Sequence, residues 1–166
     1  MSLTLAAVGA VVAAVLQLTI VPYLGIAGAY PDLLLVVAVI ATFAWSTEAG
    51  MTLAFVGGLM IDLLAPRPIG LTAFTLLLST GMAAVIGRVV QRGRVLIPIV
   101  LIFGLSFVTD LTFLGLFTAL QGKLAVADPV QLILPGAIYS TAIAVVLSPA
   151  AMAINKRFTE RERVAW

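Results

Sequence analysis

The sequence predicts an all-α membrane protein, a polytopic bundle of six transmembrane helices. Of its 166 residues, 63% are apolar and 10% are charged, whereas soluble domains contain roughly 45 to 50% apolar and about 25% charged residues. The apolar residues form continuous runs and not the strict alternation of an outer-membrane barrel. A helix satisfies its own backbone hydrogen bonds in lipid, so these runs indicate spanning helices.

A hydrocarbon core of about 30 Å requires roughly 20 helical residues, so six spans fit with short connections. We place them at residues 3–21, 31–45, 50–65, 70–87, 95–120 and 131–154. The first is interpreted as a retained anchor, because Met1-Ser2-Leu3 lacks the positive region of a cleaved signal. The second and third are short, and Gly57-Gly58 with Pro66-Arg67-Pro68 would allow a broken or re-entrant third segment. Five full spans plus one partial span is the alternative.

The cations predict the orientation of the chain in the bilayer. Seven Lys or Arg residues lie within residues 88–94 and 156–163, whereas Arg67 and Lys123 are the two in the other loops. The positive-inside rule places the two richer segments in the cytoplasm, together with the N-terminus. We therefore expect residues 1–155 to form the transmembrane domain and residues 156–166 a short cytoplasmic tail.

The polar side chains of the sequence disfavour most kinds of catalysis and metal binding. The chain contains no His and no Cys, so an imidazole base, a thiolate nucleophile, a disulfide and a zinc site cannot be built. Nine Lys and Arg residues against seven Asp and Glu residues are too few for a nucleic-acid surface. We expect no enzymatic activity, no cofactor and no metal.

Small residues recur every four positions on several spans. These ridges are Ala6, Ala10 and Ala14 on the first span, Gly50, Ala54 and Gly58 on the third, and Ser140, Ala144 and Ser148 on the sixth. Small faces let helix backbones approach closely. Packing within the chain is the favoured interpretation of each ridge. Docking of another protein's span is the alternative, which the number of ridges favours modestly.

Three aspartates lie in or beside the spans. Asp110 is near the midpoint of the fifth span, where an Asp costs about 2.5 to 3.5 kcal/mol, so it must face inward. Its structural and functional roles remain equally open. Asp62 ends the third span, where the helix dipole disfavours an anion, and Arg67 is its nearest cationic partner. Asp32 follows Pro31 and is expected to start a helix. The predicted topology brings all three aspartates into the outer half of the membrane, as a shared polar cluster.

The region 17–73 resembles the rod shape-determining protein MreD family of bacteria. The similarity is carried by Gln17, Thr19, Pro22, Pro31-Asp32-Leu33-Leu34-Leu35, Gly50, Phe55, Gly58-Leu59, Asp62-Leu63-Leu64, Pro68 and Gly70. The second half agrees in length and hydropathy, and not in distinctive residues.

This resemblance implies a non-enzymatic scaffold of the bacterial elongation complex, in the inner membrane. Such a protein binds the bitopic protein MreC, with a second copy of itself as a further candidate, and helps link MreB filaments to peptidoglycan synthesis. The family has no agreed catalytic residues. Its members also resemble the substrate-binding subunits of energy-coupling-factor transporters, which dock through a small-residue face like that of Ala6, Ala10 and Ala14.

The alternative function is therefore a vitamin-binding transport subunit. Asp110 and nearby hydroxyl groups would line its site at the middle of the membrane. The scarcity of Trp, Tyr, Asn and His inside the spans disfavours it, because small-molecule sites usually need several convergent polar or aromatic groups.

Overall fold

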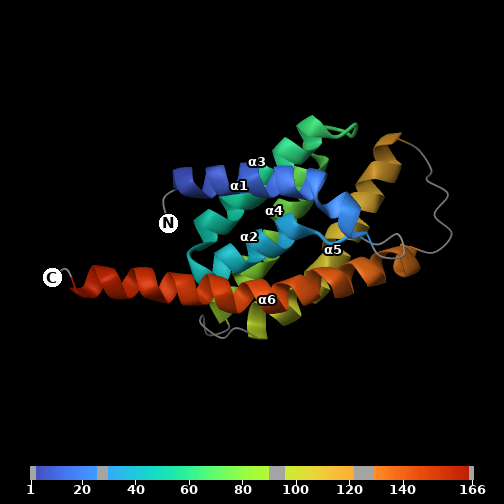
Figure 1. Ribbon diagram of the computed structural model, residues 1–166. Coiled ribbons are helices and arrows are strands. Elements are labelled where there is room, and N and C mark those ends of the chain that lie inside the picture. The colour runs from blue at the N-terminus through green and yellow to red at the C-terminus, as the bar shows by residue number, and fades with distance from the viewer. Residues whose placement is uncertain (1–2, 26–29, 90–95, 122–128, 165–166) are drawn as a thin grey trace.

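The computed structural model describes residues 3–25, 30–89, 96–121 and 129–164, and the regular structure in these ranges is helical. The elements are α1 (Leu3–Thr19), the 3₁₀ turn η1 (Val21–Leu24), α2 (Leu33–Ala44), α3 (Thr47–Leu64), α4 (Leu71–Val89), α5 (Leu96–Gln121) and α6 (Pro129–Val164). Figure 1 shows that α1 begins and α6 ends at the same end of the bundle. The predicted all-helical bundle is confirmed.

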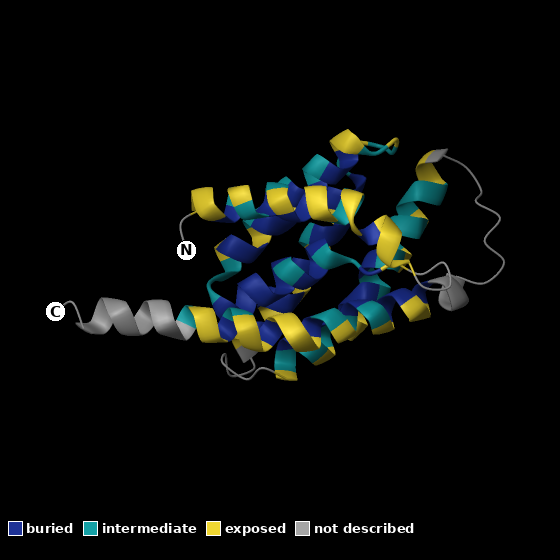
Figure 2. Cartoon of the chain, in the orientation of Figure 1, coloured by how far each residue is buried: buried dark blue, intermediate teal, exposed yellow. Residues whose placement is uncertain are grey.

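The centre of the bundle is the short helix α2. It contacts all five other α-helices, and ten of its twelve residues are buried, as the dark blue colour in Figure 2 shows. A helix that is apolar on every side is typical of such a central position. At 1.5 Å per residue, α2 is only about 18 Å long.

Four helices are long and apolar enough to cross a membrane: α3, α4, α5 and α6. Helix α1, with 17 residues, and α2, with 12, are shorter. The chain is therefore a multi-pass membrane protein. The number of complete crossings remains a prediction.

The break considered for the third segment is absent from the structure. Helix α3 is one continuous α-helix of 18 residues that includes Gly57 and Gly58. The two glycines do not break the helix, and neighbouring helices pack closely against them. A Cβ atom on Gly57 would lie 2.6 Å from the Leu34 side chain, and one on Gly58 would lie 2.5 Å from the Ala73 Cα.

The small-residue ridges lie inside the chain. Ala6, Ala10 and Ala14 are fully buried on α1, which packs chiefly against α3. The opposite face of α1 exposes Val8 and Val12, as expected for a helix whose outer face contacts lipid.

The ridge on α3 is divided between two neighbours. Gly50 faces α2, where an added Cβ would lie 2.7 Å from the Ala38 carbonyl oxygen. Ala54 is fully buried, and Gly58 faces the backbone at the start of α4. The stripe on α6, Ser140, Ala144 and Ser148, is buried too. All three ridges are therefore covered by helices of this chain.

Candidate functional site

Side chains from other helices satisfy the free backbone groups at both ends of α2. The Leu33 N–H donates to Gln17 Oε1 of α1 at 2.8 Å, and Gln17 Nε2 donates to the Pro31 carbonyl at 3.2 Å. Ser140 of α6 accepts from the Asp32 N–H at 2.9 Å. At the other end, Asn155 of α6 donates to the Ala44 carbonyl. A buried helix end needs such partners, because no water is available to replace them.

Asp32 is the N-cap of α2, as the sequence predicts. Its Oδ1 accepts from the Leu35 N–H at 3.0 Å. This position gives the carboxylate a free backbone donor and the positive end of the helix dipole.

Asp62 has a different partner from the one that the sequence suggests. It is 2% exposed, and its carboxylate accepts from the backbone N–H groups of Gly70, Thr72 and Ala73 at 2.9 to 3.2 Å. These are unpaired donors at the start of α4, so Asp62 caps the next helix and does not pair with Arg67. The prediction of an Asp62–Arg67 pair is wrong, because the amides of α4 fill the carboxylate's acceptor positions.

The turn before α4 makes this cap possible. Gly70 has a φ of +92°, a conformation that side-chain-bearing residues rarely adopt. Its N–H points to Asp62, while its carbonyl accepts from the Phe74 N–H at 2.9 Å inside α4.

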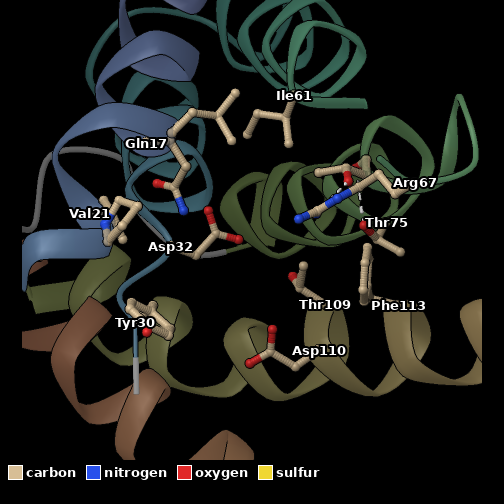
Figure 3. Close-up of a pocket in the computed structure, with 13 residues that line it drawn as sticks. Gln17, Val21, Tyr30, Asp32, Ile61, Arg67, Thr75, Thr109, Asp110 and Phe113 are labelled. Atoms are coloured by element: carbon tan, nitrogen blue, oxygen red, sulfur yellow. Dashed lines mark hydrogen bonds between the residues drawn. The ribbon is translucent and has the colours of Figure 1, made fainter. Parts of the chain in front are cut away.

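A cavity of about 350 Å³ lies where α2 begins, between α1, α3, α4 and α5; we call it the polar cavity. Its polar lining consists of Gln17, Asp32, Arg67, Thr72, Thr75, Thr109 and Asp110, with the rings of Tyr30 and Phe113 beside them. In Figure 3, Asp32, Arg67 and Asp110 point into this space from three different elements. Of the three aspartates predicted to share a polar cluster, Asp32 and Asp110 line this cavity, whereas Asp62 does not line it and caps α4 instead.

The hydroxyl groups of Thr75 and Thr109, which line the polar cavity, donate hydrogen bonds to backbone carbonyls. Thr75 Oγ1 donates to the Thr72 carbonyl at 3.0 Å. Thr109 Oγ1 donates to the Leu105 carbonyl at 2.9 Å and lies 2.7 Å from Ser79 Oγ on α4. Ser106 donates to the Ile102 carbonyl at 2.8 Å. Ser106 and Thr109, two of the hydroxyl groups near Asp110 in the sequence, therefore donate to backbone carbonyls of their own helix.

Arg67 is held at the edge of the cavity by two weak contacts. Its guanidinium lies 5.3 Å from the centre of the Phe113 ring, in a cation–π arrangement, and its Nη1 donates to Thr72 Oγ1 at 3.4 Å. In Figure 3 its guanidinium points toward Asp32. Asp110 of α5 forms no hydrogen bond within the described ranges, and it lines the polar cavity together with Asp32.

Two residues of this site were not assigned to it from the sequence. Gln17 contributed to the family resemblance, and Ser140 was interpreted as part of a ridge. Each bonds to a backbone group across the bundle, at separations of 14 to 16 residues for Gln17 and 108 for Ser140.

In the described ranges, no group of three or more His, Cys, Asp or Glu residues could hold a metal ion.

The family model of the rod shape-determining protein MreD matches residues 2–157, nearly the whole chain. The chain belongs to the MreD family. The resemblance in residues 17–73 is thereby confirmed and extends through the second half. The chain is accordingly a rod shape-determining membrane protein, from a family of structural proteins and not a known family of enzymes. No curated protein and no solved structure matches it, so the similarity to transporter subunits remains a prediction.

Proposed function

We propose that this protein is a membrane scaffold of the bacterial elongation complex, and that it binds MreC in the inner membrane. The observation that carries the proposal is the match to the MreD family over residues 2–157. Through MreC, the scaffold would link MreB filaments to peptidoglycan synthesis and so support cell shape. A second copy of the chain is a further candidate partner.

The bundle suits such a role because its interior is well connected. Side chains of α1 and α6 cap α2, and Asp62 of α3 caps α4, so a force applied to one helix is transmitted to the others. The polar groups lining the cavity are largely engaged in these contacts, and the site contains no nucleophile with a base beside it in the described ranges.

The proposed contact surface for MreC is the outward side of α5 and α6. Within their membrane spans, 22% and 28% of residues are buried, against 44% in α3 and 56% in α4. The small-residue ridges are already covered by this chain's own helices, so an added span would contact the larger side chains of α5 and α6.

The first experiment is co-purification. MreC and the full chain are co-expressed with a tag on one of them, solubilised in mild detergent and separated by size. A single peak containing both proteins is expected, while a tagged multi-pass protein of another family should retain no MreC. Separate elution would remove the basis of the proposal.

The proposed orientation, with both termini in the cytoplasm, is tested independently. The chain contains no Cys, so one introduced thiol is the only one that a reagent can label. A membrane-impermeant maleimide should label Tyr23→Cys in intact spheroplasts, and Glu48→Cys only after lysis. The reverse pattern would invert the topology.

Neither the fold nor the comparisons support the alternative of vitamin transport.

A further inference from the structure

The polar cavity contains more acidic than basic charge. Asp32 and Asp110 both line it, and Arg67 is the single cation among its lining residues, all of which lie in the described ranges. In Figure 3 the guanidinium of Arg67 points toward Asp32, whereas Asp110 lies on α5, at another side of the cavity. If all three groups are ionised, one negative charge remains uncompensated. The charge left over is that of Asp110.

Several of the remaining polar groups already donate their hydrogen bonds elsewhere. Gln17 uses its amide on the backbone before α2, and the hydroxyls of Thr75 and Thr109 donate to carbonyls. Asp110 forms no hydrogen bond in the described part of the chain, yet its side chain faces the cavity (Figure 3). A carboxylate at this depth of a membrane protein is costly unless it is paired or protonated.

We propose that the polar cavity receives one lysine or arginine side chain of a partner protein, with Asp110 as its counter-ion. This inference rests on the proposed scaffold function. One incoming positive charge balances Asp32, Asp110 and Arg67 to zero. A long basic side chain also suits the position, because its aliphatic stem can lie along apolar walls while its head reaches a polar group.

A lipid headgroup fits the same cavity less well. The ammonium of an aminophospholipid is accompanied by a phosphate, so the headgroup brings no net charge and leaves the excess negative charge in place. The phosphate would also lie near two carboxylates. A basic side chain brings a positive charge without that repulsion.

The test compares Asp110→Asn with Glu48→Gln in the full chain co-expressed with full-length MreC. Both substitutions remove one negative charge and nearly preserve the shape of the side chain, but Glu48 is exposed in the first turn of α3 and does not line the cavity. Asp110→Asn should reduce the MreC recovered by at least about tenfold, as for a buried pair that loses one partner. Glu48→Gln should leave recovery unchanged. The thermal unfolding temperature of Asp110→Asn alone should match that of the unchanged chain, because Asp110 bonds to nothing in the described fold.

A second series identifies the cation. Each Lys and Arg in and beside the MreC span is changed to Asp, and each variant is paired with Asp110→Lys. For the cation that pairs with Asp110, the two substitutions together should restore the recovery of MreC, whereas either substitution alone should abolish it.

If Asp110→Asn recovers as much MreC as the unchanged chain does, the inference is overturned and the scaffold function stands. Such a result would show that MreC binding does not depend on the charge of Asp110. If phosphatidylethanolamine in nanodiscs raises the unfolding temperature of the unchanged chain but not of Asp110→Asn, the cation is a lipid headgroup, which also overturns the inference. If the unchanged chain retains no MreC at all, the proposed function fails, and this inference fails with it.

Discussion

The contact between α3 and α4 at Gly58 should not tolerate a single added methyl group. A Cβ at this position would lie 2.5 Å from the Ala73 Cα and 2.8 Å from the Ala73 N, both backbone atoms. A side-chain rotation cannot relieve this clash. Ordinary contact begins near 3.4 Å, so Gly58→Ala requires α3 and α4 to separate locally by about 0.9 Å, the difference between 3.4 and 2.5.

That separation would also weaken the cap on α4. Asp62 Oδ2 lies 2.9 Å from the Thr72 N and 3.2 Å from the Ala73 N, and a shift of this size would carry both beyond hydrogen-bonding distance. Overpacking costs about 1 to 3 kcal/mol, and each hydrogen bond to a charged group contributes about 1.5 to 3 kcal/mol. The gain from replacing a helical Gly with Ala is only about 1 kcal/mol. We therefore expect a net loss of stability of at least about 1 kcal/mol.

The assay is thermal unfolding of the purified variant in one mild detergent, followed by circular dichroism. The matched control is Gly104→Ala on α5, because a Cβ there meets no atom within 4 Å and the same gain in helix propensity applies. Gly58→Ala should unfold at a lower temperature than the unchanged chain, and Gly104→Ala at the same or a higher temperature. Equal unfolding temperatures for the two variants would refute the close contact between α3 and α4.

The same unfolding assay checks three further substitutions. Asp62→Asn removes the charge and one acceptor from the cap of α4, and we expect a loss of about 1.5 to 3 kcal/mol; a variant as stable as the unchanged chain would show that the cap contributes little. Gln17→Leu leaves the Leu33 N–H without its acceptor and should cost about 1 to 3 kcal/mol, whereas no loss would mean that another acceptor replaces the side chain. Thr80→Val should be neutral or stabilising, because the buried Thr80 hydroxyl has no hydrogen-bond partner among the residues that the structure describes and Val has the same shape; marked destabilisation would reveal a partner for that hydroxyl.

Periodicity and capping patterns predicted the local features of this fold. The bounds of the first five α-helices agree with the predicted spans to within a few residues, as in α5, predicted at 95–120 and observed at Leu96–Gln121. Helix α6 continues to Val164, ten residues beyond the predicted end of its span at residue 154 and into the segment predicted as a tail. Asp32 was correctly assigned to a helix start, because Pro31 and the following Leu run carry that signal in adjacent residues. The small-residue ridges are buried within the chain, as the packing interpretation expects, while docking of a partner on them stays a prediction.

Features that depend on contacts between helices could not be predicted in the same way. The Gly57-Gly58 pair indicates either a break or a close approach, and only the position of Leu34 and Ala73 decides between them. Asp62 reaches amides eight to eleven residues ahead, past the nearer Arg67, because the left-handed Gly70 reverses the chain. The available signal for the central helix was its length, since Leu33–Ala44 is apolar except for Thr42 but shorter than the other predicted spans.

The short length of α2 explains why the polar cavity exists at all. Helix α3, with 18 residues, is about 27 Å long and α2 about 18 Å, at 1.5 Å per residue. The helices around α2 therefore extend beyond its first residue, and the volume that a longer apolar helix would fill is lined by Gln17, Asp32 and Arg67 instead. Since α2 is capped from α1 and α6 at fixed positions, it cannot slide to close this space. The charged cavity is thus a consequence of the fold's central helix, and it places Asp110 where a partner's cation can reach it.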